Sequence, residues 1–221
     1  MIDFAAARRM MVDGQVRTSD VTDLRLIAAM MAVPRERFVP DTRADLAYLD
    51  IDLPVTEGHG GERRLLKPMV LAKLIQAADV GESDHVLVVG CATGYSAAVL
   101  SRLAKSVVAL EQDATLAARA RENLLAIGAN NVTVANGPLT AGWPAAAPYE
   151  VILLDGASEV VPKTLFGGLK AGGRLLGVIG RVPTSKAMLY RSSGKEASGR
   201  PVFDAAAPLL PGFVEPPAFV F

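Results

Sequence analysis

The chain has 221 residues, of which 51% are hydrophobic and 5% aromatic, so it can bury the core of one domain. Its 23 basic residues balance 23 acidic ones, which gives no electrostatic signature for binding nucleic acid or an anionic membrane. One cysteine excludes an internal disulfide, and one cysteine with two histidines argues against a structural zinc site. No apolar run approaches the ~18 residues of a membrane span and no signal peptide is evident, so we expect a cytoplasmic protein.

The first part of the chain is expected to be a helical lead-in followed by a loop. In residues 1 to about 50, apolar side chains recur at three- and four-residue steps, which predicts helices. Val33 and Val39 each precede a proline and are expected to end helices, because a residue before proline avoids the α region. Residues 52–67 contain three glycines and show no sustained period. We expect a long loop there, and long loops inside compact domains are usually functional.

From Pro68 onward, strand-like and helix-like segments alternate, which favours a mostly parallel sheet covered by helices. Pro68 suits the first turn of a helix that is expected to end before Gly81. The predicted elements that follow are strand 85–89, helix 94–104, strand 106–111, a helix from Asp113 to Gly128, strand 132–134, strand 151–154, a helix near 160–170 and strand 174–179. The segment from 187 to about 203 is expected to form an antiparallel hairpin at the sheet edge.

The most informative motif is a glycine turn between a buried strand and a helix. An unbroken apolar run, 86–89, leads into Gly90, and Gly94 follows with Ala92 between them. A sharp turn that lets a ligand lie against the backbone requires such small residues. Glu111 ends the next strand, 21 positions after Gly90, where an acid can accept hydrogen bonds from both hydroxyls of a ribose. The pattern therefore predicts a site for a nucleoside-containing cofactor.

The glycine spacing favours S-adenosylmethionine over a dinucleotide. A pyrophosphate site requires Gly-x-Gly-x-x-Gly, whereas this turn reads Gly90-x-x-x-Gly94 with no third glycine at the required place. S-adenosylmethionine carries a ribose and an adenine but no phosphate, so a looser turn suffices. The alternatives are an NAD or FAD site, or a tight turn beside an incidental surface glutamate. We interpret residues 1–221 as one domain, in which 1–67 is the helical lead-in with the substrate loop and 68–221 is the cofactor-binding core.

Several segments resemble the protein-L-isoaspartate O-methyltransferase family, a branch of the class I S-adenosylmethionine-dependent methyltransferases. The matching segments are Gln15-Val16-Arg17, the string VPRERFVP at 33–40, residues 86–100 around the glycine turn, and segments 118–124, 148–150 and 169–175. The string at 33–40 is fairly specific to the family, whereas the glycine turn is shared by many methyltransferases. The resemblance covers most of the chain. It implies a Rossmann-like class I methyltransferase fold and carboxyl methylation of damaged aspartyl residues, a protein-repair reaction.

The resemblance also implies which residues form the site. The glycine turn would line the methionine part of S-adenosylmethionine, and Glu111 would bind its ribose. The full set expected to bind the cofactor is Gly90, Cys91, Ala92, Gly94, Tyr95, Glu111, Gln112, Gly137, Pro138 and Asp155. The residues expected in the substrate loop are His59, Leu65, Leu66 and Lys67. The implied acceptor is a protein or peptide with isoaspartyl residues, and no metal is expected.

The chain departs from the family pattern at three places. The family carries a Thr-Ile-Ser-x-Pro-like string whose hydroxyls face the reacting carboxylate, and this chain reads Arg-Leu-Leu-Lys-Pro at 64–68. Leu66 therefore occupies the family hydroxyl position, and the catalytic residue is left unassigned. The family's Gly-Asp pair after the third strand is Gly137-Pro138 here, where a proline side chain forms no hydrogen bond. A small hydroxyl residue at the end of the fourth strand is replaced by Asp155.

These departures leave alternatives open. Arg63, Arg64 or Lys67 could supply a cation to the acceptor carboxylate, or they could be solvated loop charges. Asp155 could be a wall of the cofactor pocket, a helix cap, a general base for a hydroxyl acceptor, or a Mg²⁺ ligand with Glu159 as its only nearby acidic partner. The other functions considered are methylation of a different acceptor and cofactor binding without turnover.

Overall fold

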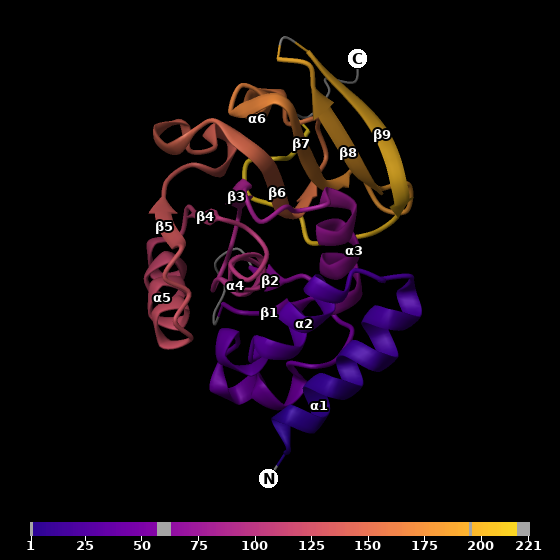
Figure 1. The fold of residues 1–221 in the computed structure, drawn as a ribbon, viewed down its shortest axis with the longest axis vertical. Helices are drawn as coiled ribbons and strands as arrows, with labels where there is room; N and C mark the ends of the chain where they lie inside the picture. The colour runs from indigo at the N-terminus through magenta and orange to yellow at the C-terminus, as the bar shows by residue number, and fades with distance from the viewer. Residues whose placement is uncertain (1, 57–62, 195, 216–221) are drawn as a thin grey trace, which may run out of the picture.

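The computed structural model describes residues 2–56, 63–194 and 196–215. Within these ranges, seven strands form one mixed sheet in the order β5-β4-β3-β6-β7-β8-β9 (Figure 1). Strands β5 to β7 in this order pair in parallel, and β8 and β9 pair antiparallel at the edge. The predicted Rossmann-like arrangement with a C-terminal hairpin is therefore confirmed. No helix in the described ranges has the length and apolar character needed to cross a membrane.

The elements of the core follow the predicted alternation. Their bounds are β3 His85–Val89, α4 Tyr95–Leu100, β4 Ser106–Glu111, α5 Ala114–Ala126, β5 Val132–Asn136, β6 Tyr149–Ser158, α6 Lys163–Phe166, β7 Leu169–Ile179, β8 Lys186–Ser192 and β9 Ala197–Asp204. Two helices are shorter than predicted. The chain after α4 tightens into turns with i to i+3 hydrogen bonds, and α6 is confined between Pro162 and Gly167-Gly168.

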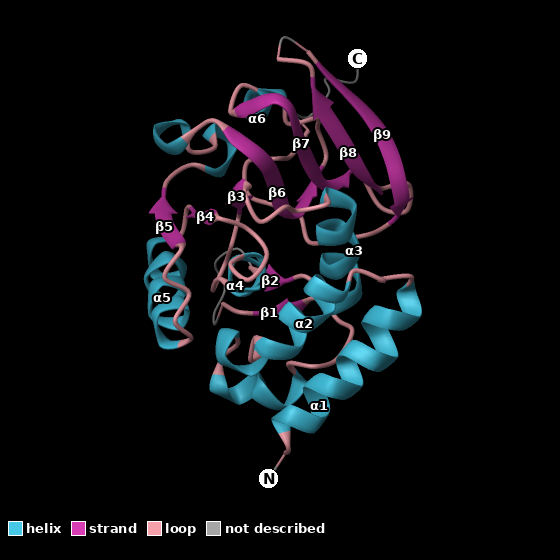
Figure 2. Cartoon of the chain, in the orientation of Figure 1, coloured by secondary structure: helices cyan, strands magenta, loops and turns pink. Residues whose placement is uncertain are grey.

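The N-terminal lead-in is helical, as predicted. It comprises α1 Phe4–Met11, η1 Val12–Val16, η2 Arg17–Ser19, α2 Leu24–Ala32, η3 Arg35–Phe38 and η4 Asp41–Leu46. Asp3 and Asp23 cap α1 and α2 by accepting backbone hydrogen bonds, and Val33 and Val39 are extended and end helices. Figure 2 shows these helices at one end of the molecule and strands β7 to β9 at the other.

The predicted loop at 52–67 contains more regular structure than expected. Strand β1 (Leu53–Pro54) pairs antiparallel with β2 (Arg64–Leu65), so the two ends of the loop lie side by side. The amide of Val55 donates to the carbonyl of Arg63 at 2.8 Å, which extends this pairing. His59 lies outside the described residues. The pairing fixes residues 63–67 immediately before α3 (Pro68–Ala78).

Both faces of the central strand β3 are buried, as is usual for parallel strands covered by helices. Val86 and Val88 of β3 belong to a large core that also contains side chains of α3, α4, α5 and the lead-in. Leu87 and Val89 point to the other face and belong to a smaller core. Leu210 and Phe213 from the C-terminal segment complete that smaller core. The amide of Leu210 donates to the carbonyl of Ala157 at 2.9 Å, so the segment runs along β6.

We expect Gly156→Ala to destabilise the fold by about 1–3 kcal/mol, the usual cost of overpacking. An added Cβ would lie 2.7 Å from the Leu210 side chain and 2.8 Å from the Pro208 carbonyl oxygen. Gly14→Ala is the control, because nothing lies within 4 Å of a Cβ there. Urea unfolding of both variants measures the effect. If Gly156→Ala were as stable as the wild type, the C-terminal segment would not pack on β6 as described.

Candidate functional site

The turn after β3 has the backbone that its glycines predict. The φ angles of Gly90 and Gly94 are +81° and +98°, a region that residues with a Cβ rarely adopt. Ala92 also has a positive φ of 50°. The amide of Gly94 donates to the carbonyl of Cys91 at 2.8 Å and closes the turn, after which Tyr95 begins α4. Cys91 is buried, and burial raises the pKa of its thiol, as expected for a packing residue rather than a reactive one.

Protein side chains lie close against this turn. A Cβ on Gly94 would lie 3.3 Å from the Leu124 side chain, so the absence of a side chain here allows α5 to pack close to the turn. A Cβ on Gly90 would lie 2.6 Å from Cδ2 of Leu210 and 3.0 Å from Nη2 of Arg63. The two glycines are therefore needed for packing within the protein. The sequence analysis explained them only by the close approach of a ligand.

Glu111 is the centre of the site. Its side chain at the end of β4 is 0% exposed. Oε2 accepts from the amide of Ala92 at 2.8 Å and from Nη2 of Arg63 at 2.9 Å. Oε1 accepts from the amides of Gln112 at 2.9 Å and Asp113 at 3.2 Å. The alternative of an incidental surface glutamate is therefore wrong, and Glu111 lies against the glycine turn, where a ribose-binding acid is expected.

Arg63 is a site residue whose partner the sequence reasoning missed. It is 7% exposed, and its Nη2 donates to the Glu111 carboxylate and to the Gly90 carbonyl, both at 2.9 Å. Its amide donates to Oγ1 of Thr56 at 3.1 Å. The interpretation of Arg63 as a solvated loop charge is therefore wrong. Its cation is paired with Glu111, a residue 48 positions away, and no local pattern predicts that pairing.

Residues 64–67 of the substrate loop are held by core packing and by hydrogen bonds between side chains and backbone. Leu65 and Leu66 are each 1% exposed and belong to the large core, so Leu66 contributes to packing. The amide of Lys67 donates to Oδ1 of Asp52, and Arg64 donates to the carbonyl of the same residue, both at 2.9 Å. The residue that meets the acceptor thus stays unassigned.

Asp155 lies within β6, which continues to Ser158 rather than ending at 154. It is 4% exposed, its Oδ2 accepts from Ser96 at 2.5 Å, and its Oδ1 has no hydrogen-bond partner in the described chain. Burial raises the pKa of Asp155 to about 6, although the Ser96 hydrogen bond and the nearby arginine cations oppose this. The helix-cap alternative is wrong, because Pro162 precedes α6 at its N-cap position.

The residues that the structure describes support no metal site. Among residues 2–56, 63–194 and 196–215, no three histidine, cysteine or acidic side chains gather closely enough to hold a metal ion. Glu159, the suggested second ligand, pairs with Arg181 at 3.0 Å. The Mg²⁺ alternative for Asp155 therefore has no supporting geometry in the described chain.

Arg35 joins the lead-in to the site. It is 0% exposed, and it donates to the carbonyls of Ala47 and Leu66, both at 2.8 Å. Its guanidinium lies 4.6 Å from the centre of the Tyr95 ring. Nη1 of Arg35 and the Tyr95 hydroxyl are buried without a hydrogen-bond partner in the described chain. Arg35 thus ties the string at 33–40 to the substrate loop and to the first residue of α4.

The remaining predicted cofactor residues surround the ends of β4 and β5. Gln112 and Pro138 are exposed, and the amide of Gly137 donates to the carbonyl of Glu111 at 3.1 Å. A Cβ on Gly137 would lie 3.1 Å from the Trp143 ring. The structure thus brings the glycine turn, Glu111 and the segment after β5 together at the carboxyl ends of parallel strands, where open α/β sheets bind ligands.

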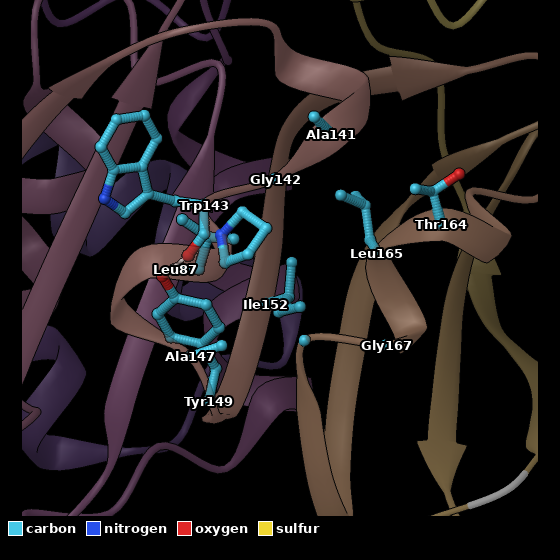
Figure 3. A pocket seen from close by; sticks show the side chains of 12 residues that line it. Leu87, Ala141, Gly142, Trp143, Ala147, Tyr149, Ile152, Thr164, Leu165 and Gly167 are labelled. Atoms are coloured by element: carbon cyan, nitrogen blue, oxygen red, sulfur yellow. Dashed lines mark hydrogen bonds between the residues drawn. The ribbon is translucent and has the colours of Figure 1, made fainter.

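A separate apolar cavity of about 250 Å³ lies beside the smaller core (Figure 3). Its wall includes Leu87, Trp143, Tyr149, Ile152 and Leu165, and it has no charged side chain. None of the predicted site residues lines this cavity. It therefore lacks the groups that methyl transfer or ribose binding requires.

Comparison with known proteins identifies the family. The family model described as Protein-L-isoaspartate(D-aspartate) O-methyltransferase (PCMT) matches residues 7–203. The chain belongs to this family. The protein-L-isoaspartate O-methyltransferase of Rhodopseudomonas palustris is 40% identical over 170 residues, 77% of this chain and 76% of that protein. The one from Methanoregula boonei is 40% identical over 173 residues, 78% of each chain.

Solved structures agree with this assignment. A protein-L-isoaspartate O-methyltransferase superposes with a TM-score of 0.81 at 26% identity, over 93% of this chain and 66% of that chain. A putative one from Plasmodium falciparum, in complex with S-adenosyl-L-homocysteine, shares the fold with a TM-score of 0.76 at 16% identity, over 95% and 99% of the two chains. The predicted family resemblance and class I fold are confirmed, and the expected cofactor is the one that this family uses.

The raised pKa of Asp155 predicts a pH-dependent loss of stability. Its usual value is 3.8 and its folded value about 6, so the folded state binds more protons between these values. Stability should therefore fall as pH rises from about 4 to 6 and stay reduced above 6. Asp155→Asn removes this titration. Its stability relative to the wild type should rise by roughly 1–3 kcal/mol between pH 4 and pH 7.5. Urea unfolding at both pH values measures this, and a pH-independent difference would contradict the assignment.

Proposed function

We propose that the chain transfers the methyl group of S-adenosylmethionine to the side-chain carboxylate of isoaspartyl residues in proteins or peptides. The family match over residues 7–203 and relatives at 40% identity named for this activity support the proposal. The observation that carries it is the buried Glu111 carboxylate, held against the glycine turn by the amide of Ala92. The acceptor class and a cytoplasmic location are both part of the proposal.

Methyl transfer to a carboxylate does not require a general acid or a general base. An acceptor carboxylate has a pKa near 4, so it is ionised at neutral pH and no base must remove a proton. The bound cofactor supplies a sulfonium methyl group, and the protein contributes chiefly by holding donor and acceptor in line. Glu111 would accept hydrogen bonds from the ribose, and the turn from Gly90 to Gly94 would lie along the methionine part. The scarcity of histidine and cysteine is therefore compatible with this activity.

Transfer of a labelled methyl group tests the proposal directly. The protein at single-turnover concentration is mixed with labelled S-adenosylmethionine and either an isoaspartyl peptide or the same peptide with normal aspartate. We expect a base-labile methyl ester on the isoaspartyl peptide only. Binding of S-adenosylhomocysteine without transfer to either peptide would contradict the proposal and indicate a cofactor-binding homologue without turnover.

Asp155 favours a second candidate, methylation of a hydroxyl acceptor. A general base must be deprotonated near neutral pH, and burial gives Asp155 a pKa of about 6. Its Oδ1 also has no hydrogen-bond partner among the described residues, so it could accept a proton. The two candidates differ in pH dependence. Base catalysis by Asp155 predicts that the transfer rate falls below pH 6, whereas transfer to a carboxylate needs no deprotonation step in that range.

We expect Glu111→Gln to raise the KM for S-adenosylmethionine at least about tenfold, because an amide replaces charge-assisted hydrogen bonds worth about 1.5–3 kcal/mol each. The kcat should change less, because the ribose does not react. Exposed Glu122 on α5 provides the control Glu122→Gln. Circular dichroism must accompany the kinetics, because Arg63 loses its counter-charge. An unchanged KM in a folded Glu111→Gln variant would remove the ribose assignment.

A further inference from the structure

The acceptor positions of the Glu111 carboxylate are all used within the protein. An ionised carboxylate offers about four lone-pair sites. The backbone amides of Ala92, Gln112 and Asp113 take three of them, and Nη2 of Arg63 takes the fourth, on Oε2. A ribose diol brings two hydroxyl donors to the same carboxylate. The ribose must therefore compete for at least one of these positions, and one of the two on Oε2 is held by the only side-chain donor among the four, Arg63.

Arg63 also lies against the glycine turn itself. Nη2 bridges Oε2 of Glu111 and the carbonyl of Gly90, both at 2.9 Å. It is also 3.0 Å from the place that a Cβ on Gly90 would take. The guanidinium thus lies between the turn that is expected to meet the methionine part of the cofactor and the acid that is expected to meet its ribose.

The ion pair between Arg63 and Glu111 is buried, but its hydrogen-bond geometry is not the strongest that an arginine can form. Both partners are removed from water, with side-chain exposures of 8% for Arg63 and 0% for Glu111, so separating them without a replacement is costly. However, both hydrogen bonds come from a single nitrogen, and Nε of Arg63 is buried without a partner in the described chain. A bidentate pair would hold the carboxylate more firmly. A ligand that supplies hydroxyl donors to Glu111 can therefore replace this contact.

Release of Arg63 does not require the backbone to move. The carbonyl of Arg63 accepts from the amide of Val55 at 2.8 Å, and its own amide donates to Oγ1 of Thr56 at 3.1 Å. These bonds belong to the pairing of β1 with β2 and involve no side-chain atom of Arg63. These backbone bonds can therefore stay in place when the Arg63 side chain leaves Oε2.

We propose that Arg63 is an internal competitor of the cofactor, which occupies the ribose-binding position on Glu111 and must be released before S-adenosylmethionine or S-adenosylhomocysteine binds. The proposal rests on the proposed function, because it takes Glu111 as the ribose-binding acid. Arg63 then sets the cofactor affinity without touching the reacting atoms. The fraction of molecules with Arg63 released multiplies the intrinsic affinity, so removing the competitor tightens binding.

Calorimetric titration with S-adenosylhomocysteine tests the competition. We expect Arg63→Gln to bind at least about tenfold more tightly than the wild type. Arg102→Gln is the matched control, because it removes an exposed cation that has no contact with Glu111, and its affinity should not change. Equal or weaker binding by folded Arg63→Gln would overturn the competition. Absence of binding by every protein would instead contradict the proposed function.

Binding kinetics of the wild type provide a test that does not depend on a folded variant. Trp143 is the only tryptophan and lies beside Gly137, one of the residues expected to bind the cofactor, so its fluorescence reports on that side of the site. If Arg63 must open first, the observed binding rate should reach a plateau as the S-adenosylhomocysteine concentration rises. In Arg63→Gln, or in Arg63→Met, the plateau should disappear. A strictly linear dependence in the wild type would overturn the requirement for release.

Discussion

An ionised carboxylate removed from water is costly unless it is paired and hydrogen-bonded, and the architecture of this site follows from that constraint at Glu111. Three of its partners are backbone amides, one from the turn after β3 and two from the residues that follow β4. The carboxylate thereby joins the ends of two neighbouring parallel strands. The bond from the Ala92 amide holds the glycine turn against the carboxylate that we propose as the ribose acceptor.

The fourth partner links the substrate loop to this centre. Arg63 neutralises Glu111 and brings the end of the loop, through the pairing of β1 with β2, against the glycine turn. If Glu111 binds the ribose as proposed, cofactor binding and loop position are coupled through this one ion pair. A second group of buried polar side chains consists of Asp155, Arg35 and Tyr95. Each of them has one buried polar atom without a hydrogen-bond partner in the described chain. Such groups are usual at functional sites and costly elsewhere.

The parts that sequence predicted are those governed by local pattern. Apolar runs of strand length, glycines at positive φ and an acid at a strand end are local signals, and β3, Gly90 and Glu111 lie where these signals indicate. The pairing of Arg63 with Glu111 could not be predicted, because the two residues are 48 positions apart and two-residue strands carry no period. Leu66 was expected to face an acceptor, yet a leucine in a loop has no local signal that distinguishes core from site.

The most direct test of this account is a crystal structure of the protein with S-adenosylhomocysteine bound. The account predicts both ribose hydroxyls within hydrogen-bond distance of the Glu111 carboxylate and the Arg63 guanidinium moved away from Oε2. The amide of Ala92 should keep its bond to Glu111, because that bond supports the turn. A ligand bound elsewhere, or a ribose bound while Arg63 keeps its contact with Oε2, would contradict the account.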